Sequence, residues 1–199
     1  MFFELLGDGK EFGVNFEYTT QDRPLGIPQA IDLALENKKY EKSLTVLGDN
    51  FIFGEKFFTN LENIFNETNG VSIFSQYVRN PGEFGIVETN EQGKVINLVE
   101  KPVKPSSNQA VIGLYIFNSK FNEYFLETEK SDRGEYEILD VVKKYGYESI
   151  VHNKIGRGTA WFDMGTTTAF HRCSSFVKTI QDEQGFLVCS PHEIAYRNG

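Results

Sequence analysis

One segment, Leu44 to Asn50 with the sequence LTVLGDN, restricts what this chain can fold into more than any other. It begins with a run of apolar and β-branched residues and ends in a Gly-Asp-Asn turn. Such a run predicts a buried parallel strand whose carboxyl end delivers one acid into the crevice where open α/β sheets bind ligands. Asp49 is therefore the first functional candidate. The alternative interpretation is that Asp49 and Asn50 only form an Asx turn that ends a strand.

The first third of the chain alternates strand and helix patterns. Apolar and polar residues alternate at 14–19 with the period of a strand, and the apolar run at 71–77 predicts another strand. Helical spacing occurs at 28–35, with a proline in the first turn, and again at 57–65. We therefore expect an α/β fold with a Rossmann-like, mostly parallel sheet and helices on both faces.

The middle of the chain changes pattern. Residues 85–89 and 94–100 flank a turn at 90–93 and predict an antiparallel hairpin. The elements expected beyond it are a strand at 110–117, helices around 121–126 and 138–145, and strands at 149–152 and 159–162. A final helix should carry Phe170, Cys173, Phe176, Val177 and Ile180 on one face. It should end at Gly185, before a less regular tail. We find no linker or repeat and expect a single domain over residues 1–199.

Composition narrows the possible partners. The chain has 199 residues, with 20 basic against 28 acidic side chains and a net charge of -8, which argues against nucleic acid or an anionic membrane as the main partner. Cys173 and Cys189 fit no disulfide framework or zinc spacing. No apolar run approaches the roughly 20 residues of a membrane span, and the start lacks a basic region and a cleavage site. We expect a soluble, cytoplasmic protein.

Two isolated aspartates follow apolar strands far apart in the sequence. Asp49 and Asp163 suit a hard cation that is held by one or two carboxylates and by phosphate oxygens of a substrate, and magnesium is the natural candidate. The segments Glu100–Pro102 and Asp132–Glu135 add a carboxylate, a lysine and an arginine that suit a sugar hydroxyl and a phosphate. The alternative is that all of these are surface charges beside turns, since charged residues are mostly exposed.

Several short motifs follow one another in a fixed order along the chain. They are Leu6-Gly7-Asp8-Gly9 with Phe12-Gly13, Gln21 and Gly26 with Gln29-Ala30, Leu47-Gly48-Asp49-Asn50, Phe84-Gly85-Ile86-Val87-Glu88, Glu100-Lys101-Pro102, Gly113-Leu114-Tyr115, Arg133-Gly134-Glu135 with Glu137-Ile138, Gly156-Arg157-Gly158 with Trp161 and Asp163-Met164-Gly165-Thr166, and Glu193 to Gly199. In this order they resemble the glucose-1-phosphate thymidylyltransferase family of the sugar nucleotidylyltransferases. The resemblance runs over essentially the whole chain.

The resemblance implies a nucleotide-diphospho-sugar transferase fold, with the hairpin in its sugar-binding part, and a role for each matching residue. The implied catalytic residues are Asp49, Asp163 and Lys101, and the two aspartates would hold Mg²⁺ against the nucleotide phosphates. The implied substrate-binding residues are Gln21 and Gly26 at the thymine base, Gly85, Glu100, Val111 and Tyr115 around the sugar, Lys101 and Arg133 at the sugar phosphate, and Trp161 close to that site.

The implied activity is a magnesium-dependent nucleotidyl transfer from dTTP to α-glucose 1-phosphate, giving dTDP-glucose, a nucleotide sugar of dTDP-rhamnose biosynthesis, and pyrophosphate. This reaction is an in-line attack in which positioning and charge neutralisation matter most, so it requires no Ser/His/Asp or Cys/His nucleophile. We accordingly interpret His152, His171 and His192 as structural or solvated. The resemblance also implies a homotetramer.

The departures from the family concern the two ends. The family begins with a strand and a glycine-rich G-x-G-T-R loop for the triphosphate and closes with further helices, and this chain matches neither. Loss of even one preorganised donor costs roughly 3 to 4 kcal/mol, so we expect a truncated domain whose own activity is weak, with an unpaired sheet edge. The alternatives are an inactive paralogue that binds nucleotide sugars, or uridylyl or cytidylyl transfer to another sugar phosphate.

Overall fold

The computed structural model describes residues 2–198, apart from the side chain of Asn198, and divides the chain into two compact units. The larger unit runs from Gln21 to Met164, and the smaller one combines the start of the chain, up to Thr20, with its end, from Gly165. All candidate site residues lie in the larger unit. That residues 1–199 form a single domain stays a prediction.

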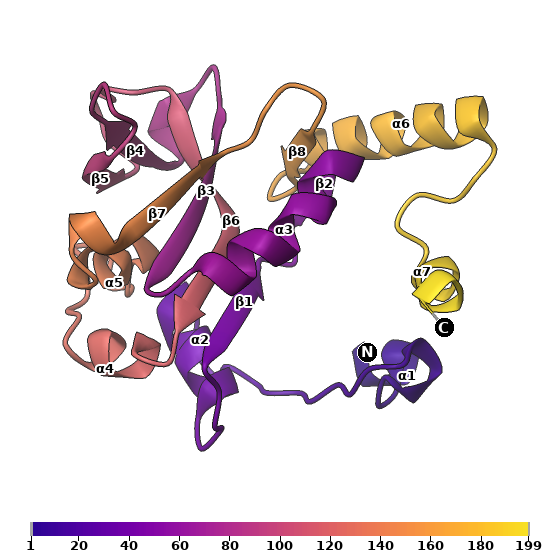
Figure 1. Ribbon diagram of the computed structural model, residues 1–199, viewed down its shortest axis with the longest axis horizontal. Helices are drawn as coiled ribbons and strands as arrows, with labels where there is room; N and C mark the ends of the chain where they lie inside the picture. The colour runs from indigo at the N-terminus through magenta and orange to yellow at the C-terminus, as the bar shows by residue number, and fades with distance from the viewer. Residues whose placement is uncertain (1, 199) are drawn as a thin grey trace. The chain divides into compact units, whose positions relative to one another are not determined.

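Strands and helices alternate in the larger unit, whereas the described residues of the smaller unit form helices and turns but no strand (Figure 1). The larger unit contains α2 (Ile27–Leu35), β1 (Lys42–Val46), β2 (Asn50–Phe53), α3 (Glu55–Glu67), β3 (Val71–Tyr77), β4 (Gly85–Thr89), β5 (Val95–Glu100), β6 (Gln109–Asn118), α4 (Phe121–Leu126), α5 (Ile138–Lys144), β7 (Ile150–Lys154) and β8 (Ala160–Asp163), with short 3-10 turns η2 (Pro81–Glu83) and η3 (Tyr147–Ser149). The smaller unit contains α1 (Phe2–Leu6), η1 (Lys10–Phe12), α6 (Thr167–Gln184) and α7 (Pro191–Asn198). Within residues 2–198, no helix is both long and apolar enough to cross a membrane.

The main sheet has the strand order β5-β4-β6-β3-β7, with β1 also paired to β6 (Figure 1). Strand β6 runs antiparallel to β1, β3 and β4, whereas β3 and β7 are parallel. Strands β1, β3, β4 and β7 therefore share one direction. A second, two-stranded ladder joins β2 to β8.

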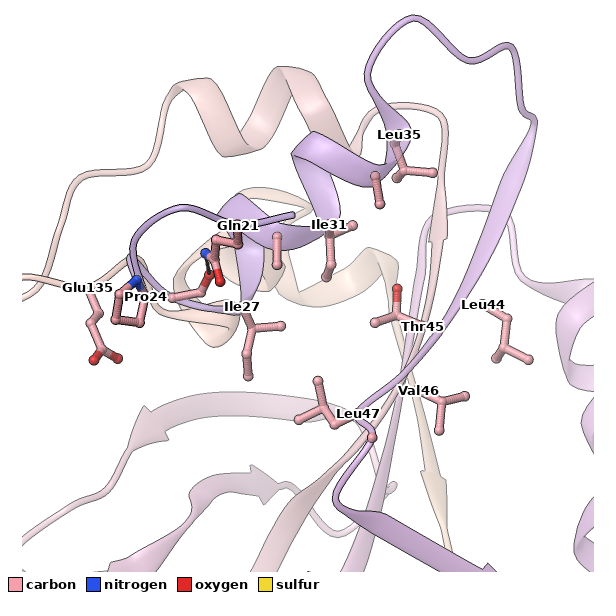
Figure 2. Close-up of a pocket in the computed structure, with 14 residues that line it drawn as sticks. Gln21, Pro24, Ile27, Ile31, Leu35, Leu44, Thr45, Val46, Leu47 and Glu135 are labelled. Carbon is pink, nitrogen blue, oxygen red and sulfur yellow. Dashed lines mark hydrogen bonds between the residues drawn. The ribbon is translucent and has the colours of Figure 1, made fainter. Parts of the chain in front are cut away.

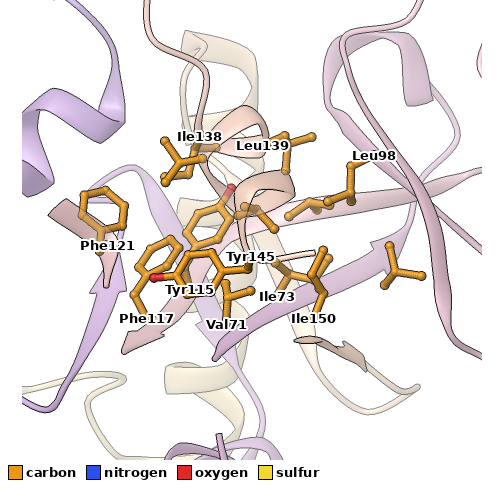
Figure 3. Close-up of a cluster of buried hydrophobic side chains, with 14 of the residues drawn as sticks. Val71, Ile73, Leu98, Tyr115, Phe117, Phe121, Ile138, Leu139, Tyr145 and Ile150 are labelled. Carbon is orange, nitrogen blue, oxygen red and sulfur yellow. The ribbon is translucent and has the colours of Figure 1, made fainter. Parts of the chain in front are cut away.

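Side chains of β6 alternate between two hydrophobic clusters because successive residues of a strand point to opposite faces. Tyr115 and Phe117 enter a cluster with α2, α4 and α5 (Figure 3). Ile112, Leu114 and Ile116 enter a second cluster, to which α3 contributes Phe57, Leu61, Ile64 and Phe65. Helices thus cover both faces of the sheet, and the predicted α/β fold is confirmed.

Strand β1 differs from the sequence-based expectation. Instead of a buried parallel strand, it is an antiparallel partner of β6 and of no other strand in residues 2–198. Leu44 and Val46 are 43% and 53% exposed. The prediction was wrong because an apolar run shows that a strand favours burial but carries no information on which partner lies beside it or in which direction.

Two segments of the smaller unit also differ from what the sequence predicted. The alternating residues 14–19 form no strand; the N–H groups of Val14 and Phe16 donate instead to the carbonyls of Gly9 and Asp8 across the preceding turn. The less regular tail contains a helix, α7. Ser190 caps it through a 3.4 Å hydrogen bond from the N–H of Glu193, and Pro191 occupies the first helical position, so this start signal was readable but missed.

The remaining elements are confirmed with small differences in their ends. The strand at 71–77 has the predicted limits, and the hairpin pairs β4 with β5 in an antiparallel register that sets Gly85 opposite Glu100. The final helix α6 ends at Gly185, whose φ of 72° is the left-handed conformation that glycine adopts at a helix end. The hairpin and the β2–β8 ladder position the site described next.

Candidate active site

The backbone segments that carry the two candidate metal ligands lie side by side where β2 begins and β8 ends. The β2–β8 ladder sets Asn50 opposite Asp163, and the N–H of Met164 donates to the carbonyl of Asp49 over 2.7 Å. Residues 114 positions apart in sequence are thereby held on neighbouring strands. Asp49 is exposed and Asp163 is half-buried, so both carboxylates can be approached by a ligand.

These carboxylates suit magnesium by their chemistry. Mg²⁺ prefers oxygen ligands and is usually held by one or two carboxylates, with substrate phosphates and water completing its octahedron. Across residues 2–198, no group of three or more His, Cys, Asp or Glu side chains is arranged as a self-sufficient metal cage. A pair of aspartates that needs phosphate oxygens to complete the coordination is the pattern expected of a magnesium–nucleotide site.

Gln21 and Gly26 line a cavity of about 630 Å³ between α2 and β1. In Figure 2, Ile27 of α2 and Leu47 after β1 point toward one another across it. The Nε2 of Gln21 donates to the carbonyl of Gly26 over 3.1 Å and to Oε1 of Gln29 over 2.6 Å. The amide of Gln21 is therefore fixed, with its own oxygen left as an acceptor.

Gly26 is required by the backbone that surrounds it. Its φ is 108°, and a Cβ at this position would lie 2.2 Å from the carbonyl oxygen of Tyr136. The N–H of Tyr136 donates to the carbonyl of Leu25 over 2.9 Å, which holds the two segments together. Only glycine permits this close approach of two backbones.

Glu100 lies at the hairpin end of the site, opposite Gly85. A Cβ on Gly85 would lie 2.9 Å from Oε2 of Glu100, so the missing side chain leaves room for this carboxyl group. Burial raises the pKa of Glu100, and the charge of Glu137 raises it further. Tyr115 and Val111 are buried on β6, and burial together with the charge of Glu100 raises the pKa of the Tyr115 phenol.

Lys101 follows Glu100 in a strained conformation. Its φ is 41°, in the left-handed region that residues other than glycine rarely adopt, and its N–H donates to the carbonyl of Phe84 over 3.1 Å. Strain of this kind persists where surrounding structure enforces it, and it concentrates at functional sites. The charges of Lys101 and Arg133 both lower the pKa of Glu100, but burial and the charge of Glu137 outweigh them and leave that pKa raised.

Arg133 is held by Glu137, a residue that sequence reasoning included only as part of a motif. Its Nε donates to Oε1 of Glu137 over 3.1 Å and its Nη2 to Oε2 over 2.7 Å. Burial raises the pKa of Glu137, but hydrogen bonds from Arg133 and Ser131 outweigh this and leave that pKa lowered. The hydrogen bond to Glu137 in turn raises the pKa of Arg133. Both residues precede α5, so no helical spacing announced this pair in the sequence.

Trp161 connects the aspartate end of the site to the hairpin end. Its indole N–H donates to Oδ1 of Asn50 over 2.6 Å, and its ring meets the ring of Phe84 edge-on, with centroids 5.5 Å apart. Phe84 directly precedes Gly85. The structure thus joins Asp49, Asp163 and Trp161 through Asn50, whereas sequence reasoning named Asn50 and Phe84 only as members of motifs and gave neither a role in the site.

Comparison with known proteins shows the family to which the chain belongs. The family model described as Nucleotidyl transferase matches residues 1–180. A glucose-1-phosphate thymidylyltransferase from Xanthomonas campestris pv. campestris (strain B100) is 39% identical over 200 residues, covering 100% of this chain and 68% of the relative. One from Mycobacterium tuberculosis (strain H37Rv) is 40% identical over 199 residues, covering 100% of this chain and 69% of the relative.

Solved structures share the fold. A Bacillus anthracis protein assigned to the same enzyme class, solved in complex with a sucrose, superposes with a TM-score of 0.76 at 33% identity and covers 87% of this chain and 70% of that one. A UDP-glucose pyrophosphorylase complexed with UDP-glucose superposes with a TM-score of 0.73 at 20% identity, covering 83% of this chain and 66% of that one. At that identity the likeness extends to the fold alone.

Proposed function

Because the chain belongs to the nucleotidyl transferase family, and within it to the glucose-1-phosphate thymidylyltransferases, we propose that it serves the synthesis of dTDP-glucose and pyrophosphate from dTTP and α-glucose 1-phosphate. The observation that carries the proposal is the β2–β8 ladder, which brings Asp163 beside the Asp49-Asn50 turn. The larger unit also holds Gln21 for a base, the half-buried Glu100 for a sugar, and Lys101 and Arg133 for a phosphate.

In the proposed reaction an oxygen of the sugar phosphate attacks the α-phosphorus of dTTP, forming one P–O bond while the bond to the pyrophosphate breaks. Asp49 and Asp163 would hold Mg²⁺, which when bound neutralises charge on the nucleotide phosphates. Lys101 and Arg133 would bind the sugar phosphate and bring its oxygen into line. The pairing of Arg133 with Glu137 orients the guanidinium before substrate arrives, and the hydrogen bond to Phe84 holds the backbone from which Lys101 extends.

The sugar would lie against Gly85, Glu100, Val111 and Tyr115. The half-buried carboxyl of Glu100 is an acceptor for sugar hydroxyls, and Gly85 leaves the space beside it. Trp161 and Phe84 close the site toward the aspartates.

Gln21 and Gly26 would contact the thymine. Since Nε2 of Gln21 is engaged by Gly26 and Gln29, its Oε1 is the atom left to accept the N3–H of the base. Uracil carries the same N3–H, so this contact alone does not separate thymidylyl from uridylyl transfer, and the experiment must compare the two. Assembly as a homotetramer and a cytoplasmic location remain proposals that rest on the family resemblance.

The test is formation of dTDP-glucose from dTTP, glucose 1-phosphate and Mg²⁺, with UTP and CTP as competitors. Asp49→Asn should lower the rate by at least about 100-fold, since it removes a metal ligand without changing the shape of the side chain. Asp182→Asn, an exposed aspartate of α6, is the matched control and should leave the rate unchanged. An Asp49→Asn variant as active as the wild type would overturn the metal assignment, whereas binding of dTDP-glucose without turnover would favour a nucleotide-sugar-binding protein.

A further inference from the structure

The carboxamide of Asn50 bonds to three separate parts of the larger unit. Its Oδ1 accepts the backbone N–H of Gly113 over 3.0 Å and the indole N–H of Trp161 over 2.6 Å. Its Nδ2 donates to Oδ1 of Asp49 over 2.8 Å. Both donors lie on the oxygen side of the amide, so the amino group has to face the Asp49 carboxylate.

The surrounding backbone is shaped for this amide. Gly113 lies within β6, the strand that pairs with β1, β3 and β4, where a glycine weakens the strand and calls for a packing reason. A Cβ at Gly113 would lie 2.7 Å from Nδ2 of Asn50 and 2.7 Å from Cδ1 of Leu47. Any side chain at this position would displace the carboxamide, so the glycine supplies both a donor and the space that Asn50 occupies.

Asp49 is thereby held at two points. Its backbone carbonyl accepts the N–H of Met164, and its Oδ1 accepts the amino group of Asn50. Its Oδ2 has no hydrogen-bond or ion-pair partner among residues 2–198. One oxygen of the carboxylate is thus fixed by the protein while the other remains available to a ligand.

We propose that Asn50 is a positioning residue that holds the Asp49 carboxylate in one orientation for the divalent cation, and that Gly113 and Trp161 hold Asn50 in turn. The proposal rests on the proposed function, because it takes Asp49 as a metal ligand. Partners that orient a ligating carboxylate are worth about 10-fold to 100-fold in metal affinity. The same chain of hydrogen bonds links the metal ligand to Trp161, close to the proposed sugar site.

The test measures Mn²⁺ binding in the presence of dTTP, from the electron paramagnetic resonance signal of free Mn²⁺. Asn50→Ala removes the amide, and Gly113→Ala displaces it without changing any polar group. Each should weaken Mn²⁺ binding by about 10-fold. The double variant should bind Mn²⁺ no more weakly than the more strongly affected of the two single variants, because both substitutions act on the same amide. If the two substitutions only destabilised the fold independently, their losses of Mn²⁺ affinity would instead add.

Matched controls separate this effect from a general loss of structure. Asn60→Ala removes an exposed amide on α3, and Gly156→Ala adds a Cβ that meets nothing within 4 Å, so both should bind Mn²⁺ like the wild type. Circular dichroism shows which variants fold. Asn50→Ser is the second variant if Asn50→Ala does not fold, because its hydroxyl is too short to span all three partners, and it should show the same loss.

The outcomes separate this inference from the proposed function. If the wild type binds Mn²⁺, Asp49→Asn does not, and the folded Asn50 variants bind it as the wild type does, the positioning role is overturned and the metal assignment stands. If Asp49→Asn binds Mn²⁺ as the wild type does, or if neither binds it, the metal assignment itself fails, and the role of Asn50 fails with it.

Discussion

The carboxylate of Glu137 accepts two hydrogen bonds from the guanidinium of Arg133, over 2.7 and 3.1 Å, from a position that is only 7% exposed. Ser131 donates a third, over 2.6 Å. Because the buried Glu137 carboxylate is held by three hydrogen bonds, it fixes the direction of the Arg133 guanidinium. This pair explains how an exposed arginine can be preorganised for a phosphate.

Glu137→Gln should destabilise the protein by about 1 to 3 kcal/mol, because it replaces the charged acceptor of buried hydrogen bonds by a neutral amide. The folded pKa of Glu137 is lowered, so its contribution is present above the pKa of the unfolded chain and is lost as pH falls. Urea denaturation at pH 7 and pH 3 measures both effects, and the variant should differ from the wild type much less at pH 3. Glu62→Gln, exposed on α3, is the control. Equal stability of Glu137→Gln and the wild type at pH 7 would contradict the account of this pair.

Gly26→Ala should destabilise the larger unit by about 2 to 3 kcal/mol or prevent its folding, since the new Cβ would meet the Tyr136 carbonyl in a backbone conformation that alanine disfavours. Thermal unfolding measures the change. Gly48→Ala is the matched control, because the methyl group that it adds would meet nothing within 4 Å. A Gly26→Ala protein as stable as Gly48→Ala would show that the two backbones separate readily.

Lys101→Gly should raise stability by about 1 kcal/mol while weakening the binding of glucose 1-phosphate. Glycine adopts a φ of 41° without strain, so the substitution should stabilise the folded chain. It also removes the charged side chain that would bind the phosphate, so affinity should fall. Chemical denaturation gives the first quantity and isothermal titration the second. The control is Lys104→Gly, which removes the same charge in the same exposed loop at a residue without a positive φ. It should neither raise stability nor weaken the binding of glucose 1-phosphate. A Lys101→Gly variant that loses stability would mean that this backbone is not strained.

His152 predicts a pH dependence of a different kind. It lies 2.7 Å from the hydroxyl of Ser75, and burial lowers the pKa of its imidazole to about 4. A folded pKa below the unfolded value means that stability is complete above about pH 6.5 and falls as pH decreases toward 4. The loss should be about 1 to 2 kcal/mol, because a half-buried site is partly screened.

His152→Gln should remove this part of the pH dependence, measured as unfolding free energy between pH 7 and pH 4, whereas His171→Gln, which changes an exposed histidine of α6, should retain it. A His152→Gln protein with the full pH dependence would place its origin elsewhere.

Local patterns predicted most elements of the fold, because periodicity within a segment reflects which of its faces are buried. The strand at 71–77 and the hairpin at 85–100 are the clearest cases. Strand β1 was wrongly predicted to have a parallel neighbour, because its partner, β6, lies roughly 70 residues further along the chain, and no local pattern encodes that pairing.

The site was predictable only in part. Asp49 was recognisable as an acid at a strand end, but its neighbour Asn50 looked like a turn residue because its partners Gly113 and Trp161 lie 63 and 111 positions away. The roles of Gln21 and Gly26 came from family resemblance alone, since neither occurs in a pattern that has one chemical meaning. Long-range contacts of single side chains decide these roles, and they appear only once the chain is folded.

The most direct test of the proposed function is the emission of Trp161, the only tryptophan in the chain, titrated with dTDP-glucose and with UDP-glucose. Its indole bonds to Asn50 and its ring packs against Phe84, so a nucleotide sugar between the aspartates and the hairpin should change its surroundings. We predict saturable quenching at lower concentrations of the thymidine compound than of the uridine compound. A folded chain whose emission responds to neither compound would contradict it.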